Sequence, residues 1–134
     1  MTESKIKDLI TYWEQGSLED LASAEDIILK AKRYQQGLFF VHLSIEKILK
    51  AAVVKETNTH APMTHNLLFL AQKAKLTLST EQLEILSEIN SFNMSMRYPD
   101  EIEKIKKKST QEMALKILDQ AKALHLWILQ NFKN

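Results

Sequence analysis

The hydrophobic pattern is strongest between Gly37 and Val54, where aliphatic side chains recur at spacings of three and four residues. Further apolar side chains fill the positions on either side of this stripe, so a helix here is apolar around most of its circumference. Such a helix must be covered by other helices. The pattern therefore predicts a buried central helix that ends near Glu56.

One polar row interrupts this helix, because His42, Glu46 and Lys50 are spaced four residues apart with Lys47 beside them. Side chains at this spacing lie along one strip of a helix. A purely structural interpretation is available, since Glu46 ahead of Lys50 is a favourable helical ion pair. In the functional interpretation, Lys47 and Lys50 attract a phosphate while His42 and Glu46 orient a base or ribose, in a cleft shared with His65.

An amphipathic stripe also runs along the N-terminal segment and keeps its register across Gly16. It predicts one helix from about Ser4 to Lys32. Gly16 costs about 1 kcal/mol relative to alanine inside a helix, and Ser17 with Asp20 resembles a helix start. A break near Gly16 is therefore the alternative.

Three more helices are predicted after a loop at Thr57 to Thr64. The expected starts are Thr64 as N-cap of a helix His65 to Lys75, a capping box of Ser79 and Gln82 opening a helix to about Met94, and a second box of Ser109 and Glu112 opening the last helix. The segment around Pro99 separates the last two helices. Five helices with short connections predict an all-α fold, an up-and-down bundle of four to five helices in a single domain over residues 1–134.

Composition narrows the functional classes. The 134-residue chain contains no cysteine, which excludes disulfides, a thiolate nucleophile and a cysteine zinc site. Its net charge of +1 gives no argument for nucleic acid from the molecule as a whole. The N-terminus carries Glu3 and Asp8, and every apolar run is far shorter than the span of about 20 residues that crosses a membrane. We therefore predict a cytoplasmic protein with no membrane contact.

Charge is concentrated in the segment Glu101 to Lys108, EIEKIKKK. It is interpreted either as a solvated loop or helix start, or as a patch in which its lysines join Arg97 to attract phosphate. Arg97 and Tyr98 precede Pro99, and this pair is suited to clamping a phosphate and stacking a base. Alternatively, Arg97 binds the carbonyls at a helix end and Tyr98 packs on the core.

The spacing of the histidines does not indicate a metal site. His65 stands at a predicted helix start, where an imidazole can cap the helix or pair with Glu46. A metal site built from His42, His60, His65 and Glu56 has no recognised ligand spacing. We predict neither a metal nor a cofactor.

Several segments together resemble a known family. They are the Tyr12-Trp13 pair in the first helix, the central FFVHLSIEKILKAAV, the loop Pro62 to Leu67, and Arg97 to Asp100. In this order they resemble prokaryotic HEPN-domain proteins of the small stand-alone type that is often encoded beside a minimal nucleotidyltransferase. The resemblance implies a bundle of four or five helices, usually a homodimer, with a polar cleft for nucleotides or other polyanions.

Many HEPN proteins are metal-independent endoribonucleases whose Arg and His, a few residues apart, stabilise phosphate charge and transfer protons. This sequence departs from that spacing, because the first histidine after Arg97 is His125, and eight residues separate Arg33 from His42. The resemblance therefore implies a non-catalytic module that binds nucleotide or RNA, acts with a nucleotidyltransferase, and belongs to a toxin–antitoxin system. The alternatives are a ribonuclease with a non-standard site, built from Arg97 with His42 or His65, and a structural adaptor.

Overall fold

The computed structural model describes residues 1–133, and within them the regular structure is entirely helical. The elements are α1 (Glu3–Asp26), a π-helical turn η1 (Ile27–Ala31), α2 (Tyr34–Thr57), α3 (Leu67–Lys73), α4 (Thr80–Asn90), α5 (Pro99–Lys108) and α6 (Gln111–Lys133). The prediction of an all-α fold is confirmed. None of these helices is long and apolar enough to cross a membrane.

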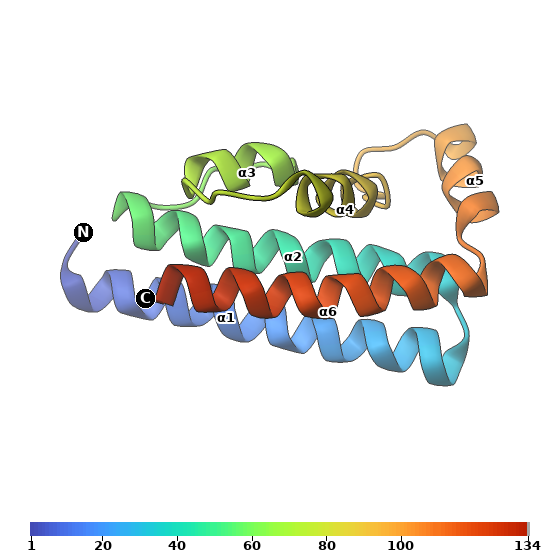
Figure 1. Cartoon of the computed structure of the whole chain (residues 1–134), viewed down its shortest axis with the longest axis horizontal. Coiled ribbons are helices and arrows are strands. Elements are labelled where there is room, and N and C mark those ends of the chain that lie inside the picture. Colours follow the sequence, from blue (N-terminus) through green and yellow to red (C-terminus); the bar gives the residue numbers. More distant parts are fainter. Residues whose placement is uncertain (134) are drawn as a thin grey trace.

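The helices form an up-and-down bundle (Figure 1). α2 runs antiparallel to α1, and α3 and α4 then run one after the other back along α2. α6 runs antiparallel to α1. Two ion pairs between α1 and α6 show this direction, Lys122 with Glu25 and Lys133 with Glu14. α5 stands across one end of the bundle. Residues 1–133 hold six α-helices instead of the predicted five, because α5 is a helix in its own right.

The segment Glu101 to Lys108, for which the sequence indicates a solvated loop or helix start, lies within α5. Pro99 occupies the first helical turn, where backbone N–H groups have no acceptor within the helix, so the missing N–H of proline costs no hydrogen bond. Asp100 and Glu101 lie near the positive N-terminus of the helix dipole, and three lysines lie in the last turn. The same charge order that suggested a solvated segment therefore stabilises a short helix.

α2 forms the centre of the bundle, as predicted, and packs against α1, α3, α4 and α6. Its fully buried apolar residues are Leu38, Val41, Ile45, Ile48, Leu49, Ala51, Ala52, Val53 and Val54. The helix ends at Thr57, one residue past the predicted end, where Asn58 adopts a left-handed conformation with φ of 56°. The predicted end is therefore correct to within one residue, whereas the helix begins at Tyr34, three residues before the apolar pattern does.

α1 passes Gly16 without a break, which confirms the single long helix. The alternative start at Ser17 is wrong, because Ser17 is buried inside the helix and its hydroxyl donates to the carbonyl of Glu14 at 2.7 Å. A serine whose hydroxyl binds the preceding turn does not cap a helix.

The predicted caps are right at one helix and wrong at two. Ser79 and Gln82 form the expected reciprocal capping box of α4. Thr64 does not cap α3; the Asn66 side chain does, by accepting from the amide of Phe69 at 3.2 Å. The hydroxyl of Thr64 instead accepts from the amide of Asn66 at 3.1 Å, so the loop continues two residues further than expected.

Ser109 does not cap the last helix either, because its hydroxyl donates to the carbonyl of Ile105 at the end of α5, at 2.6 Å. Thr110 takes the role and accepts from the amide of Met113 at 3.1 Å. α4 also ends earlier than the predicted Met94, at Asn90, where the side chain turns away to accept from the amide that opens α3.

Two glycines on helix interfaces give opposite expectations for substitution by alanine. A Cβ at Gly37 would overlap Cγ1 of the buried Ile28 and lie 3.0 Å from its Cδ1, so Gly37→Ala should lower the free energy of unfolding by about 2 kcal/mol. A Cβ at Gly16 meets only the flexible Lys47 side chain, at 3.2 Å, and Gly16→Ala should raise it by up to about 1 kcal/mol. Urea unfolding of both variants is the measurement, and a change of the same sign in both would contradict this account.

Candidate functional site

The Glu46 carboxylate is the centre of a buried polar cluster. Its Oε1 lies 2.8 Å from Nδ1 of His65, and its Oε2 lies 3.0 Å from Nζ of Lys50. Glu46 and Lys50 are only 5% and 8% exposed, and Lys50 Nζ also lies 5.1 Å from the centre of the Trp13 ring. The predicted pairing of His65 with Glu46 is confirmed. A carboxylate buried this deeply requires both partners to offset its lost hydration.

His42 is completely buried beside this cluster. It connects α2 to the loop that precedes α3. Its Nε2 donates to the backbone carbonyl of His65 at 3.2 Å, which leaves Nδ1 as an acceptor with no hydrogen-bond partner, 3.9 Å from Glu46 Oε1. Burial lowers the pKa of His42 to about 4, against the smaller opposing effect of the Glu46 charge. The imidazole is therefore neutral near pH 7.

The other predicted site residues lie outside this cluster. Lys47 turns toward α1 and pairs with Asp20 at 2.8 Å. Arg97 donates from Nε to the carbonyl of Asn93 at 3.1 Å and from its guanidinium to Glu101 at 3.0 Å. Tyr98 is 74% exposed, so the alternative in which it packs on the core is wrong. The structure thus groups four of the seven candidates, His42, Glu46, Lys50 and His65, and separates Lys47, Arg97 and Tyr98 from them.

Arg97 belongs instead to a basic groove between α5 and the end of α4. Arg97, Lys104 and Lys108 line a hollow of about 460 Å³, together with Ser91, Glu101 and Ile105. Lys108 donates to the Ser91 hydroxyl at 2.6 Å and lies 4.5 Å from the centre of the Phe92 ring. Within residues 1–133 the four lysines of α5 form no ion pair with a carboxylate. This groove contains three of the cations expected in a phosphate-attracting patch.

Sequence reasoning missed a second buried polar network, which joins α1, α2 and α6. His125 Nε2 donates to Ser17 Oγ at 2.9 Å, and Ser44 Oγ donates to the Ser17 carbonyl at 2.7 Å. Burial lowers the pKa of His125. The available signal was the presence of these polar residues at core positions of their apolar stripes, between Leu124 and Ile128 in the case of His125.

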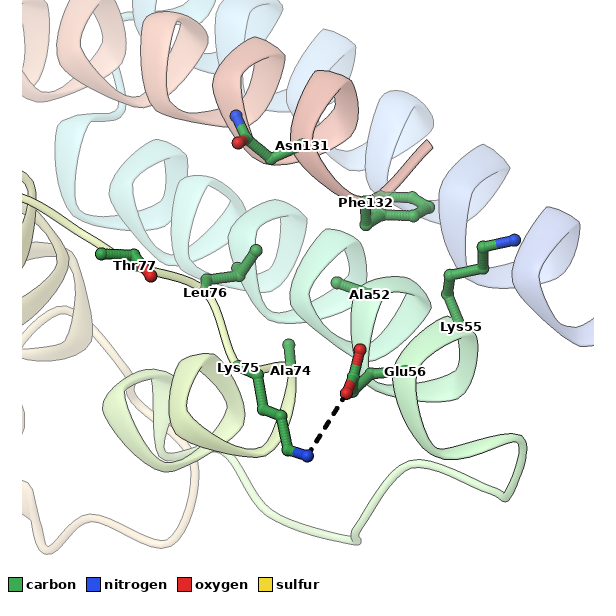
Figure 2. Close-up of a pocket in the computed structure, with 9 residues that line it drawn as sticks. All are labelled: Ala52, Lys55, Glu56, Ala74, Lys75, Leu76, Thr77, Asn131 and Phe132. Carbon is green, nitrogen blue, oxygen red and sulfur yellow. Dashed lines mark ion pairs between the residues drawn. The ribbon is translucent and has the colours of Figure 1, made fainter. Parts of the chain in front are cut away.

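A further groove, of about 350 Å³, lies where α2, α3 and α6 end, and Figure 2 shows the residues that line it. Its charged residues are Lys55, Glu56 and Lys75, with Lys75 Nζ 3.5 Å from Glu56 Oε1. None of the predicted site residues lines it. Among the described residues no group of three or more His, Cys, Asp or Glu side chains is placed to hold a metal ion.

Comparison with known proteins bears on the whole bundle. A family model for the HEPN domain matches residues 10–132. Searches of curated proteins and of solved structures found no match. The match extends from the first helix to the last, and it agrees with the family resemblance of the central strip and the Arg97 segment. The chain therefore belongs to the HEPN domain family.

Proposed function

We propose that this protein is a non-catalytic HEPN module that binds the phosphates of a nucleotide or RNA through the basic groove at α5. The observation that carries this proposal is the grouping of Arg97, Lys104 and Lys108 around one hollow, with Glu101 as the only carboxylate in its wall. Clustered cations attract phosphate through charge, and a guanidinium adds paired, directional donors.

Tyr98 does not line the groove, but it follows Arg97 in the chain and is a candidate for base recognition. It directly precedes α5 and is 74% exposed, although aromatic rings are usually at least partly covered. An exposed ring one residue from Arg97 offers a flat face on which a base can stack while the phosphate contacts the cations. The ligand this arrangement suits is single-stranded RNA or a free nucleotide.

In this proposal the buried cluster supports the fold and does not line the ligand site, because none of its residues lies in the wall of the basic groove. His42 and Lys50 hold Glu46 and the loop that carries His65 in place. The side chain of His65 remains 45% exposed, so it is the member of the cluster that a ligand can contact.

A ribonuclease built from Arg97 with His42 is less well supported. His42 is completely buried, is neutral near pH 7 because of its lowered pKa, and uses its Nε2 proton for the His65 carbonyl. A catalytic histidine must reach the ribose hydroxyl or the leaving oxygen to exchange a proton with it. Incubating mixed RNA without metal tests this alternative: cleavage that is lost in Arg97→Ala would favour the enzyme over the binding module.

Binding to a fluorescein-labelled RNA oligonucleotide tests the groove. Replacing Arg97 and Lys104 with glutamine should weaken binding about tenfold or more at low salt, and should reduce the salt slope by about 0.7 for each lost phosphate contact. The matched control replaces Lys5 and Lys7, which are exposed on α1, with glutamine. It should leave the affinity for RNA and its salt dependence nearly unchanged. Fluorescence anisotropy at several salt concentrations is the measurement. Equal weakening in both double variants would show diffuse attraction instead of a site.

The proposal also includes assembly as a homodimer and action with a minimal nucleotidyltransferase, as one component of a toxin–antitoxin system. The support for these is the family membership together with the resemblance to the stand-alone type. Light scattering of the purified chain measures whether it is a homodimer. Co-expression with a minimal nucleotidyltransferase, followed by tagged purification, tests the partnership. A monomer would contradict the homodimer, and a nucleotidyltransferase that does not co-purify would contradict the partnership.

A further inference from the structure

A long groove runs between α4 and α6, which lie next to each other in the bundle (Figure 1). Two hollows of about 410 and 630 Å³ adjoin there and share Glu81, Ile85 and Gln120 in their walls. On α6 the groove extends from Met113 to Trp127. At 1.5 Å per residue this span corresponds to about 21 Å of helix axis.

The floor of the groove is apolar. Ile117 and Leu124 are buried at its base, and Ile85, Met113 and Trp127 are half-buried along it. A half-buried tryptophan beside a hollow leaves a large apolar face that a partner can cover. The floor therefore suits a row of aliphatic side chains from another segment.

The rim of the groove is acidic. Glu81, Glu84 and Glu88 project from α4 and Asp119 from α6, whereas Lys116 is the only cation in the walls. Within residues 1–133 none of these four carboxylates takes part in an ion pair. The chain as a whole has a net charge of +1, so this negative charge is local to the groove.

We propose that this groove binds a basic amphipathic helix of a partner protein. Aliphatic residues at every third or fourth position of that helix would fill the apolar floor, while Lys and Arg on its flanks would meet the unpaired carboxylates. A helix of about 14 residues matches the length of the groove. The proposal rests on this groove alone and does not depend on the basic groove at α5.

Two other occupants fit less well. Nucleic acid would be repelled by the carboxylates on the rim. The basic helix of a second copy, α5, already uses its apolar side within its own chain, because Ile105 is only 5% exposed there. A partner with its own basic amphipathic helix meets neither objection.

A synthetic peptide of about 14 residues tests the proposal, with Leu at helical spacing, Lys elsewhere and a fluorescein label. The wild-type chain should bind it, and Glu84→Lys with Glu88→Lys should weaken binding about tenfold or more, since attraction becomes repulsion at two sites. The matched control, Glu3→Lys with Glu19→Lys, makes the same change of charge on α1 and should leave the affinity nearly unchanged. The emission of Trp127 in a Trp13→Phe variant should shift to the blue as the peptide covers the indole.

Three results would overturn the proposal. Equal binding of a scrambled peptide of the same composition would mean that the apolar floor plays no part. Equal weakening by the two charge variants would mean that the groove is not the site. Loss, in the groove variant alone, of a self-association measured by light scattering would mean that the occupant is a second copy of this chain.

Discussion

Glu46→Ala is expected to lower the free energy of unfolding by about 3–5 kcal/mol, the usual effect of removing one partner from a buried ion pair. Without this carboxylate, Lys50 would remain in the interior with only the Trp13 ring nearby, and Nδ1 of His65 would lose its 2.8 Å partner. The loop before α3 would then be held at His65 by the bond from His42 to its backbone carbonyl, without the side-chain contact to Glu46. Urea unfolding followed by circular dichroism at pH 7 measures the change.

Two variants isolate the cause of this expected loss. Glu101→Ala breaks the exposed pair with Arg97 and should cost less than about 1 kcal/mol, as surface pairs do. Glu46→Leu combined with Lys50→Met removes both charges, and the double variant should regain part of the stability that Glu46→Ala loses. If Glu46→Ala and Glu101→Ala proved equally mild, the buried cluster would not hold the bundle together.

The fold was predictable because its main signal is local. The stripe around Leu38 to Val54 required enclosure on most sides, and three or four companion helices were the only segments available to provide it. The stripe across Gly16 likewise outweighed the helix-start signal at Ser17. Caps were less predictable, because several serines and threonines compete at each helix start and tertiary contacts select among them.

The candidate site was only partly predictable, because helical spacing places residues on one strip but does not reveal what covers that strip. His42 and Glu46 are contacted by the loop that contains His65, and this loop has no apolar period from which its path follows. The groove between α4 and α6 was not predicted for the same reason, because helical spacing does not reveal which helices pack together. Its walls come from helices whose contacts depend on the packing of the whole bundle.

Burial of the strip also determines how stability depends on pH. The folded protein holds the pKa of His42 near 4, whereas an unfolded histidine titrates near 6.5, so below pH 6.5 the unfolded state takes up a proton that the folded state does not. The free energy of unfolding should therefore fall by about 3 kcal/mol as the pH drops from 7 to 4 through this group alone. His125 acts in the same direction, because burial lowers its pKa as well.

The His42→Gln variant separates this contribution from the titration of carboxylates, which both proteins share. Its amide keeps a donor for the His65 carbonyl but takes up no proton in this range. Urea unfolding at intervals between pH 7 and pH 4.5 should show a shallower decline for the variant than for the wild type, and the two curves should converge as the pH falls. Parallel curves would mean that His42 accepts a proton in the folded bundle as readily as in the unfolded chain. In that case the unpaired Nδ1 would be able to turn toward Glu46, and the strip would be a proton-accepting site instead of a fixed support.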